Sequence, residues 1–406
     1  MNNRIYKVIS RQLWAEAERT GVFRGAPIDL EDGFIHFSSA TQVVETVAKH
    51  FAGQTDLLLI EVDAGRLGES LRWEVSRGGA LFPHLYGHLP LESVISIVEL
   101  PLEPEGSHRF PANLVPLKPV IVGIGEVLWD IFPDGPRFGG APANYACHAA
   151  GMGARSHMVS AVGRDELGEK ALQALADRGV ITESIQLNDR PTGAVFIKLD
   201  AEGKASYEFL ENASWDHLQW STGLEQLASE ASAVCFGTLG QRSDASRQTI
   251  RRFVDATPAS CLRIFDINLR PPFYVDETIL ASLEIANILK LNDDELPIVA
   301  KLAGIHGTDR EITQSLAQRF NLQLVALTRG PHGALLVRSE EVSDHPGISV
   351  PVIDTVGAGD AFTAALTQGV LSELELDAIN DRATRVAAFV CSQAGATPAL
   401  AKELLD

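Results

Sequence analysis

The sequence predicts an α/β protein built on a mostly parallel sheet with helices on both faces, preceded by a separate small α+β domain. Two observations support this prediction. The chain has 406 residues, which is more than one hydrophobic core usually serves. From residue 118 onward, short apolar runs alternate with longer amphipathic segments, as they do in repeated βαβ units.

A proline-rich stretch separates the two parts of the chain. Prolines recur between residues 104 and 119 and interrupt any regular periodicity, which is typical of a linker. We therefore expect an accessory domain at 1–103, a linker at 104–117 and the larger domain at 118–406.

Within the larger domain, short apolar runs predict strands and amphipathic runs predict helices. The expected strands are 120–125, 233–236, 263–267, 288–291 and 324–328. The expected helices are 144–151, 166–178, 246–256, 294–303, 311–320, 360–371 and 382–394. Because open α/β sheets bind ligands beyond the carboxyl ends of their strands, the loops after these strands should carry the chemistry.

Charge and hydropathy argue against several classes of protein. The 34 Lys and Arg against 53 Asp and Glu give a net charge of −19, which disfavours a nucleic-acid partner because phosphates require clustered cations. No apolar run reaches the roughly 18 residues of a membrane-spanning helix, and the N-terminus lacks the apolar stretch of a secretory signal. We therefore expect a cytoplasmic protein without a membrane partner. The four cysteines form no C-x-x-C pair, so no zinc site is indicated.

The most informative stretch lies at 353–365. Gly357, Ala358 and Gly359 are small enough for backbone N–H groups to approach an anion, and a helix beginning near Asp360 would add its positive end. A carboxylate beside a bound phosphate is costly unless it has a task. Accepting a proton from an attacking hydroxyl is such a task in phosphoryl transfer. The alternative is a glycine-rich loop followed by an Asp N-cap.

Residues 353–365 resemble the C-terminal signature of the PfkB, or ribokinase-like, sugar kinases, and further matches extend over about residues 118–400. The resemblance implies a ribokinase-like fold with a small β lid, and ATP-dependent phosphorylation of a sugar hydroxyl. It also implies that Asp360 is the general base and that the turn at Gly357–Gly359 is the anion hole. The Walker A pattern is absent from the sequence, and this family binds phosphate without one.

Two further segments match the sugar-binding motifs of the family. Gly139, Gly140 and Asn144 resemble its N-terminal motif, whose residues meet the sugar hydroxyls. The alternative is a turn followed by a helix with Pro142 near its first turn. Asp130 follows a strand at the position of a substrate-binding aspartate.

The segment at 265–270 has the form found in the fructokinases of the family. By this resemblance Asp266 and Asn268 line the cleft, Arg270 approaches the phosphates, and fructose is the expected sugar. The alternative for Arg270 is an exposed surface arginine.

Metal-binding residues are implied at two places. Asn292 and Glu295 form the N-x-x-E element of the family, which holds Mg²⁺ through its water shell. A helix N-cap, with Glu295 at its third position, is an alternative that is compatible with this role. Asp354 falls where the family binds a monovalent cation, K⁺.

The resemblance also implies a nucleotide site. Thr328, Gly330 and Gly333 match the loop that faces the ATP phosphates, and Asn292 would contribute to it. Ser392 falls where the family packs adenine.

Alternating apolar residues at 130–138 and 192–209 predict exposed strands that would form the lid. A lid would expel water, so that ATP is not hydrolysed before the sugar arrives. Family members often dimerise through it, so a homodimer is an open option here. Gln241 and Arg242 are further candidates for contact with the substrate.

The first hundred residues predict a compact α+β domain, with strand-like alternation at 32–38 and a helix at 40–51. Segments 32–38 and 82–87 resemble a small bacterial domain family without assigned activity, which we associate with the ADP-ribosyltransferase-like fold. Hydrogen-bonded core and turn residues are the favoured alternative to a binding role. The candidates for such a role are His36, Ser38, Arg77, His84 and Tyr86.

Two other functions stay open beside the sugar kinase. One is a nucleoside kinase on the same scaffold, and the other is a ligand sensor whose kinase domain has lost activity. The presence of Asp360, Asn292 and Glu295 argues against the sensor, since a decayed site should have lost at least one of them.

Overall fold

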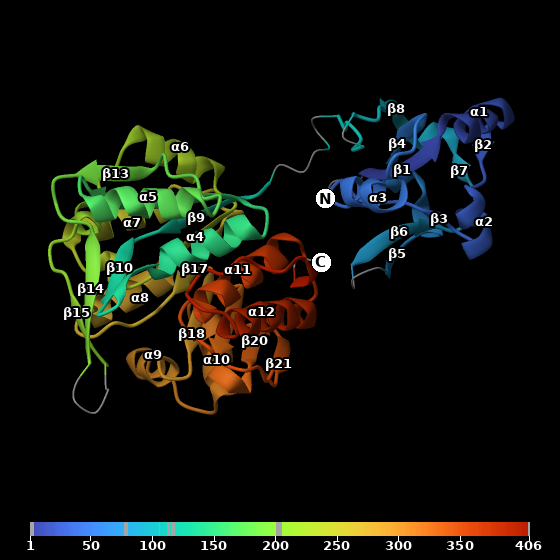
Figure 1. Cartoon of the computed structure of the whole chain (residues 1–406). Helices are drawn as coiled ribbons and strands as arrows, with labels where there is room; N and C mark the ends of the chain where they lie inside the picture. The colour runs from blue at the N-terminus through green and yellow to red at the C-terminus, as the bar shows by residue number, and fades with distance from the viewer. Residues whose placement is uncertain are drawn as a thin grey trace. The chain divides into compact units, whose positions relative to one another are not determined.

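The computed structural model describes residues 4–76, 80–104, 106–111, 114, 118–199 and 205–404. Contacts divide the chain into two units, Met1–Leu117 and Lys118–Asp406, which are described separately below (Figure 1). Among the residues described, no helix has both the length and the apolar character needed to cross a membrane.

Within the described residues of the first unit, the structure has three small sheets and three α-helices. Its strands are β1 (Arg4–Ser10), β2 (Val22–Phe23), β3 (Ile35–His36), β4 (Leu57–Asp63), β5 (Leu71–Val75), β6 (Leu81–Leu85), β7 (Leu89–Pro90) and β8 (Val94–Leu100). Its helices are α1 (Arg11–Thr20), α2 (Pro27–Asp32) and α3 (Val43–His50). The sheets have the orders β1-β4-β8, β3-β6-β5 and β2-β7, and every pairing is antiparallel.

Two elements of this unit differ from the sequence-based expectation. The strand expected at 32–38 is reduced to β3, because α2 extends to Asp32 and Gly33 then ends it with a left-handed φ of 81°. The helix expected at 40–51 is shortened to α3, because residues 39–42 form a turn before it.

Part of the expected linker belongs to the core of the first unit. Leu114 is 5% exposed and packs with Leu57 and Leu100, and Phe110 lies against the same cluster.

The second unit is built on a nine-stranded sheet with the order β13-β12-β9-β16-β17-β18-β19-β20-β21. The pairings from β13 to β19 are parallel, and β20 and β21 are antiparallel. The strands are β9 (Val120–Ile124), β12 (Arg155–Gly163), β13 (Ile185–Asn188), β16 (Ala233–Phe236), β17 (Leu262–Asp266), β18 (Ile288–Asn292), β19 (Leu324–Thr328), β20 (Ala334–Arg338) and β21 (Glu341–His345).

Helices cover both faces of this sheet, because successive side chains of a buried strand point to opposite faces. Val122 of β9 faces one core, which contains α6 (Thr222–Glu230), α7 (Asp244–Asp255), α8 (Asp276–Ile285), α9 (Leu296–Leu302) and α10 (Asp309–Arg319). Ile121 faces the other, which contains α4 (Ala141–Gly151), α11 (Ala358–Leu371) and α12 (Leu376–Cys391). Helix α5 (Glu166–Ala176) packs with α4 over β12. The prediction of a mostly parallel sheet flanked by helices is confirmed.

A separate four-stranded sheet contains the two stretches expected to form the lid. Its strands are β10 (Leu128–Phe132), β11 (Gly135–Gly139), β14 (Gly193–Leu199) and β15 (Ala205–Phe209), in the order β11-β10-β14-β15. Residues 200–204 of the expected lid lie outside the described residues.

Candidate active site

Parallel strands β9, β16, β17 and β18 end at the same edge of the sheet, and the expected site residues follow them. Asp266 is the last residue of β17, and Asn292 is the last residue of β18. The start of α11 contributes Asp360 to the same region, as its contacts with α4 and its electrostatic coupling to β17 show.

The turn before α11 has a backbone that excludes larger residues. Gly357 is the N-cap of α11 with a left-handed φ of 80°, and a Cβ atom there would lie 2.2 Å from the backbone oxygen of Ala396. A Cβ atom at Gly359 would lie 3.1 Å from Nζ of Lys290. The first N–H groups of a helix lack intrahelical partners, so this end of α11 can bind an anion.

Asp360 lies in the first turn of α11, where Asn144 donates from Nδ2 to its Oδ2 at 2.8 Å. The pKa of Asp360 is raised to about 6, chiefly by burial and then by the carboxylate of Asp266. The hydrogen bond from Asn144 and the positive charges of Lys290 and Arg270 act in the opposite direction. A carboxylate with this pKa is mainly ionised at neutral pH, yet it is a stronger base than an ordinary aspartate.

A buried ion pair between Lys290 and Asp266 interacts electrostatically with Asp360. Lys290 Nζ lies 3.0 Å from Asp266 Oδ1, and Thr363 donates to Asp266 Oδ2 at 2.9 Å. Burial lowers the pKa of Lys290, but Asp266, Glu295 and Asp360 raise it to above its ordinary value. Sequence reasoning missed Lys290, although a lysine inside the apolar run of β18 was a visible signal.

The paired glycines before α4 allow two close approaches. Gly140 has a φ of 110°, and a Cβ atom there would lie 2.6 Å from the backbone oxygen of Glu126. A Cβ atom at Gly139 would lie 3.0 Å from Oδ2 of Asp130. Burial raises the pKa of Asp130, and the positive charge of Arg270 lowers it. Gly139 therefore leaves room for the carboxyl group of Asp130.

Asn144 is buried, with 3% of its surface exposed. Its Nδ2 is engaged by Asp360, while its Oδ1 has no hydrogen-bond partner within the described part of the chain. Asn144 thus orients Asp360 and retains one free acceptor. Its predicted contact with a sugar hydroxyl stays a prediction.

The family model "pfkB family carbohydrate kinase" matches residues 135–403. The chain belongs to the pfkB carbohydrate kinase family. It is 30% identical over 299 residues to a sugar kinase of Pyrococcus horikoshii, covering 68% of this chain and 91% of that protein. It is 29% identical over 296 residues to a fructokinase of Escherichia coli, covering 68% of this chain and 94% of that protein.

The fold of the second unit is shared with solved members of the family. The crystal structure of the Pyrococcus horikoshii sugar kinase in complex with ATP has a TM-score of 0.59, with 30% identity, and covers 68% of this chain and 94% of that one. The expectations of a ribokinase-like fold and a carbohydrate kinase are confirmed at the level of the family.

Two residues of the pfkB unit follow β17. Arg270 is exposed, and its charge lowers the pKa values of Glu126, Asp130 and Asp360, so it lies within electrostatic reach of all three carboxyl groups. Asn268 has a positive φ of 45° and lines a small cavity together with Asp266. Sequence reasoning had proposed a surface arginine as the alternative, and Arg270 is both exposed and close to the carboxyl groups.

The N-x-x-E pair of the pfkB unit forms a closed hydrogen-bonded turn. Asn292 Oδ1 accepts from the Glu295 N–H at 2.8 Å, and Glu295 Oε2 accepts from the Asn292 N–H at 2.9 Å. Glu295 Oε1 accepts from the N–H of Leu269 at 2.8 Å, and Glu295 is 4% exposed. Both carboxylate oxygens are thus engaged, so the pair fits a hydrated Mg²⁺ rather than a directly coordinated one. Helix α9 begins at Leu296 with Glu295 as its N-cap residue, so Asn292 is not the N-cap and Glu295 is not at the third helical position.

The expected nucleotide residues occupy the turn after β19. Gly330 and Gly333 both have positive φ, and a Cβ atom at Gly333 would lie 2.0 Å from the backbone oxygen of His345. Thr328 ends β19, where its hydroxyl donates to the backbone oxygen of Leu291 at 3.3 Å. Their predicted contacts with ATP stay predictions.

The residues expected near adenine and K⁺ lie in adjoining segments. Asp354 accepts from the N–H groups of Val356 and Gly395 at 3.1 and 3.3 Å. Ser392 donates from its hydroxyl to the backbone oxygen of Phe389 at 2.7 Å. These bonds stabilise the chain around the segment that precedes Gly357.

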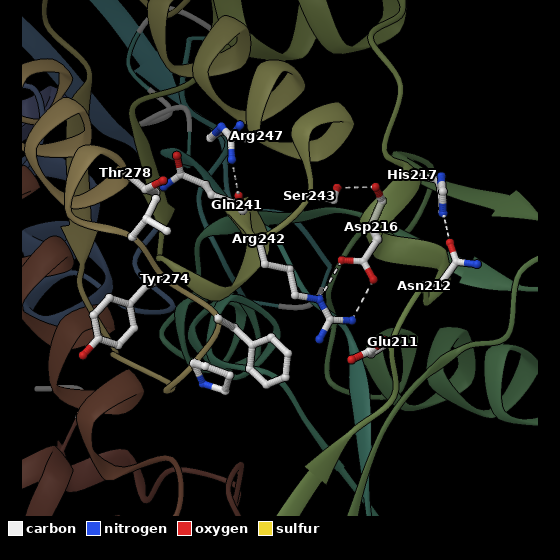
Figure 2. A pocket seen from close by; sticks show the side chains of 13 residues that line it. Glu211, Asn212, Asp216, His217, Gln241, Arg242, Ser243, Arg247, Tyr274 and Thr278 are labelled. Atoms are coloured by element: carbon white, nitrogen blue, oxygen red, sulfur yellow. Dashed lines mark hydrogen bonds and ion pairs between the residues drawn. The ribbon is translucent and has the colours of Figure 1, made fainter.

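A surface pocket of about 470 Å³ lies against the loops that follow β16 and β17 (Figure 2). Figure 2 shows the guanidinium of Arg242 directed at Asp216, to which it donates at 2.8 and 2.7 Å. Gln241 donates to the backbone oxygen of Gly237 and to Ser282, each at 2.9 Å. Gln241 is therefore occupied by internal hydrogen bonds, whereas Nη1 of Arg242 has no hydrogen-bond partner within the described residues.

The first unit brings three of its five candidates together. The rings of His36 and His84 lie 5.3 Å apart, and Phe34 contacts both and also Tyr86. Glu74 accepts from Tyr86 at 3.0 Å and lies 2.9 Å from Nδ1 of His84.

The remaining two candidates are Ser38 and Arg77. Ser38 donates to Thr46 at 3.1 Å, and Arg77 lies outside the described residues. A family model described as "Protein of unknown function (DUF952)" matches residues 8–97. The expected family without assigned activity is confirmed, and the ADP-ribosyltransferase-like fold stays a prediction.

Proposed function

We propose that this protein transfers the terminal phosphoryl group of ATP to a sugar hydroxyl, with fructose as the favoured sugar. The observation that carries the proposal is the carboxylate of Asp360 at the first turn of α11, held by Asn144 beside the Gly357–Gly359 turn. A base and an anion-binding helix end in one place are the two requirements of phosphoryl transfer to an alcohol.

Each residue of the site has a defined task in this reaction. Asp360 takes the proton of the sugar hydroxyl as that oxygen forms its bond to phosphorus and the bond to ADP breaks. The N–H groups at Ala358 and Gly359 bind the phosphoryl oxygens, and Arg270 adds a positive charge. Asp130, Gly139, Gly140 and Asn144 would orient the sugar.

Other loops of the chain would bind ATP and the metal ions. Mg²⁺ would supply charge neutralisation on the phosphates, with Asn292 and Glu295 holding its water shell. Thr328, Gly330, Gly333 and Ser392 would bind ATP, and Asp354 would bind K⁺. The Pyrococcus horikoshii relative bound to ATP supports ATP as the donor.

Fructose is favoured by two independent observations. The segment at 265–270 has the form found in the fructokinases of the family. The Escherichia coli relative at 29% identity is a fructokinase.

Two further expectations belong to this proposal. Phe196 and Tyr207 of the lid sheet are 40% and 63% exposed, which supports a homodimer through the lid. The acidic composition and the absence of a membrane-spanning helix among the described residues support a cytoplasmic site of action.

A substrate panel tests the proposed function. Fructose, other hexoses, ribose and nucleosides are each incubated with Mg-ATP, and ADP release is measured for the whole chain and for Asp360→Asn. We expect turnover with fructose that is lost in the variant. Turnover with a nucleoside alone would favour the nucleoside kinase, and binding without turnover of any compound would favour the sensor.

A further inference from the structure

Glu126 is a buried carboxyl group whose place in the structure is not explained by packing. It follows β9 at the edge where the active site lies, and only 3% of its surface is exposed. Its Oε2 atom has no hydrogen-bond partner within the described residues. Buried side-chain oxygens nearly always have a partner, so an exception at an active site calls for a functional reason.

The Glu126 carboxyl group lies in a small cavity formed by three segments. The cavity is lined by Pro142 of α4, by Thr238 after β16, and by Asn268 after β17. A Cβ atom at Gly240 would lie 3.4 Å from Glu126 Oε2. The backbone of the loop after β16 therefore approaches the carboxyl group closely.

Several charged groups face Glu126 from the elements around it. The pKa of Glu126 is raised by Asp360 of α11 and lowered by Arg270 of the loop after β17. Asp266 of β17 lines the same cavity as Glu126. The thiol of Cys235, near the end of β16, lines the same cavity and is influenced by the same charged groups. The pKa of this thiol is raised mainly by burial. It is also raised by the carboxyl groups of Asp266, Asp360 and Glu126, and it is lowered by the charge of Lys290.

The charges in this cluster do not balance. Three carboxyl groups, those of Glu126, Asp266 and Asp360, face two cations, Lys290 and Arg270. Asp266 is held by Lys290 at 3.0 Å and by a hydrogen bond from Thr363, which stabilise its ionised form. The charge of Arg270 acts on both Glu126 and Asp360, and Lys290 also acts on Asp360 but is not among the main influences on the pKa of Glu126. Two carboxyl groups in this position favour a state in which one of them keeps a proton.

The environments of the two groups decide which one keeps the proton. Burial raises the pKa of Glu126 to about 7 and that of Asp360 to about 6. Asp360 accepts a side-chain hydrogen bond from Asn144, which favours its ionised form. Glu126 Oε2 receives no hydrogen bond within the described residues, and the backbone N–H groups of Glu126 and Ala141 lower the pKa of Glu126 less than burial raises it. The proton therefore resides on Glu126 while Asp360 is ionised.

We propose that Glu126 is a positioning residue for phosphoryl transfer, whose carboxyl group keeps the proton of the Glu126–Asp360 pair. The neutral Glu126 leaves Asp360 free to act as the base and removes one negative charge from the region where the phosphates of ATP bind. Ionisation of Glu126 would restore that charge and weaken ATP binding. This inference rests on the proposed function for the position of ATP.

Calorimetry of Mg-ATP binding tests this inference without turnover. Wild type, Glu126→Gln and Glu126→Asp are titrated with Mg-ATP between pH 6.5 and 8.5, in two buffers with different ionisation enthalpies. At pH 8, one unit above a pKa of about 7, about a tenth of the wild-type Glu126 is neutral.

We therefore expect wild type to take up a fraction of a proton when Mg-ATP binds at pH 7.5, and to lose affinity as the pH rises toward 8.5, by up to about tenfold. Glu126→Gln should show neither effect, because its amide does not titrate. Glu126→Asp should recover both. Equal proton uptake and equal pH dependence in wild type and Glu126→Gln would overturn the inference.

A second measurement covers the case in which Glu126→Gln does not fold. Glutamate side chains of the wild-type chain are labelled with ¹³C at the carboxyl carbon and titrated by NMR. We expect one glutamate to titrate near pH 7, well above the others, and the absence of such a resonance would overturn the inference. If no sugar is phosphorylated but proton uptake and this resonance are found, the proposed function fails while the proton pair stands.

Discussion

Asn144 donates a hydrogen bond to Asp360 at 2.8 Å, although 216 residues separate them in the sequence. Asn144 comes from the second turn of α4 and Asp360 from the first turn of α11. The bond fixes the carboxylate in one orientation and favours its ionised form. The orientation of the proposed base therefore depends on the packing of two helices that come from opposite ends of the pfkB unit.

Replacing Asp360 with Asn should abolish phosphoryl transfer. Loss of a general base commonly lowers the rate by on the order of 10² to 10⁴. Sugar binding, measured by calorimetry, should survive, since Asn has nearly the same shape. Asp377→Asn, which alters an exposed acid in the first turn of α12, is the matched control and should keep its rate. Near-normal turnover by Asp360→Asn would contradict the assignment of the base.

Replacing Asn144 with Ala should move the acid limb of the pH–rate profile to higher pH. The hydrogen bond from Asn144 lowers the pKa of Asp360, which is about 6, so its loss should raise that pKa. A larger fraction of Asp360 is then protonated at pH 6 to 7, and kcat/KM falls there more than at pH 8. The measurement is kcat/KM against pH for wild type and variant. A uniform loss at every pH would assign Asn144 to substrate binding alone.

Gly357→Ala and Gly395→Ala separate steric exclusion from backbone strain. Both glycines have nearly the same left-handed φ, 80° and 82°, so each substitution carries a conformational cost of about 1 to 2 kcal/mol. Only Gly357 also faces a contact of 2.2 Å with the backbone of Ala396, whereas a Cβ atom at Gly395 meets open space. Gly357→Ala should therefore also displace the anion-binding turn and lower kcat on the order of 10²-fold. Equal kcat values for the two variants would argue against this turn as the phosphate site.

Lys290→Met should destabilise the fold strongly. The side chains of Lys290 and Asp266 are 8% and 6% exposed, so removing one charge leaves the other buried without its partner. Such losses cost about 3 to 5 kcal/mol, measurable by urea unfolding. Lys170→Met breaks an exposed pair with Glu166 and should have a much smaller effect. The double variant Lys290→Met with Asp266→Asn should recover part of the loss, and no recovery would mean that the two charges are not coupled.

A chain that begins at Lys118 should fold and retain sugar phosphorylation. The hydrophobic clusters around the central sheet are built from residues 120 onward, and the site residues all lie within this unit. Circular dichroism and ADP release would test both statements. Aggregation of the shortened chain would show that the kinase unit requires the first unit to fold.

Much of the fold was accessible from the sequence because the buried strands have a strong signal. Expected strands 233–236 and 324–328 coincide with β16 and β19, and the alternating stretches of the lid form one sheet. Helix starts were less accurate. Helix α11 begins at Ala358, two residues before the expected start, because the left-handed Gly357 sets its beginning. Helix α12 begins at Leu376 rather than 382, since polar residues interrupt the apolar pattern before Arg382. Asp377 is exposed, and Asn380 is buried and donates to the backbone oxygens of Ala334 and Ser343.

Only those residues of the candidate site that belong to sequence motifs could be predicted. The glycines, Asn144 and Asp360 belong to recognisable segments, and the structure brings Asn144 and Asp360 into contact. The pairing of Asp266 with Lys290 depends on a neighbouring strand, as does the environment of Glu126, whose Oε2 has no hydrogen-bond partner within the described residues. Such relationships have no local sequence signal, because periodicity reports the face of a strand and not what lies beside it.

The proposed base, Asp360, belongs to a helix that begins 238 residues after the start of β9, the first strand of the central sheet. During synthesis, every strand of that sheet therefore leaves the ribosome before Asp360. A nascent or prematurely ended chain can acquire much of its secondary structure and still be unable to consume ATP. If Asp360 is the base, only a nearly complete polypeptide can consume ATP.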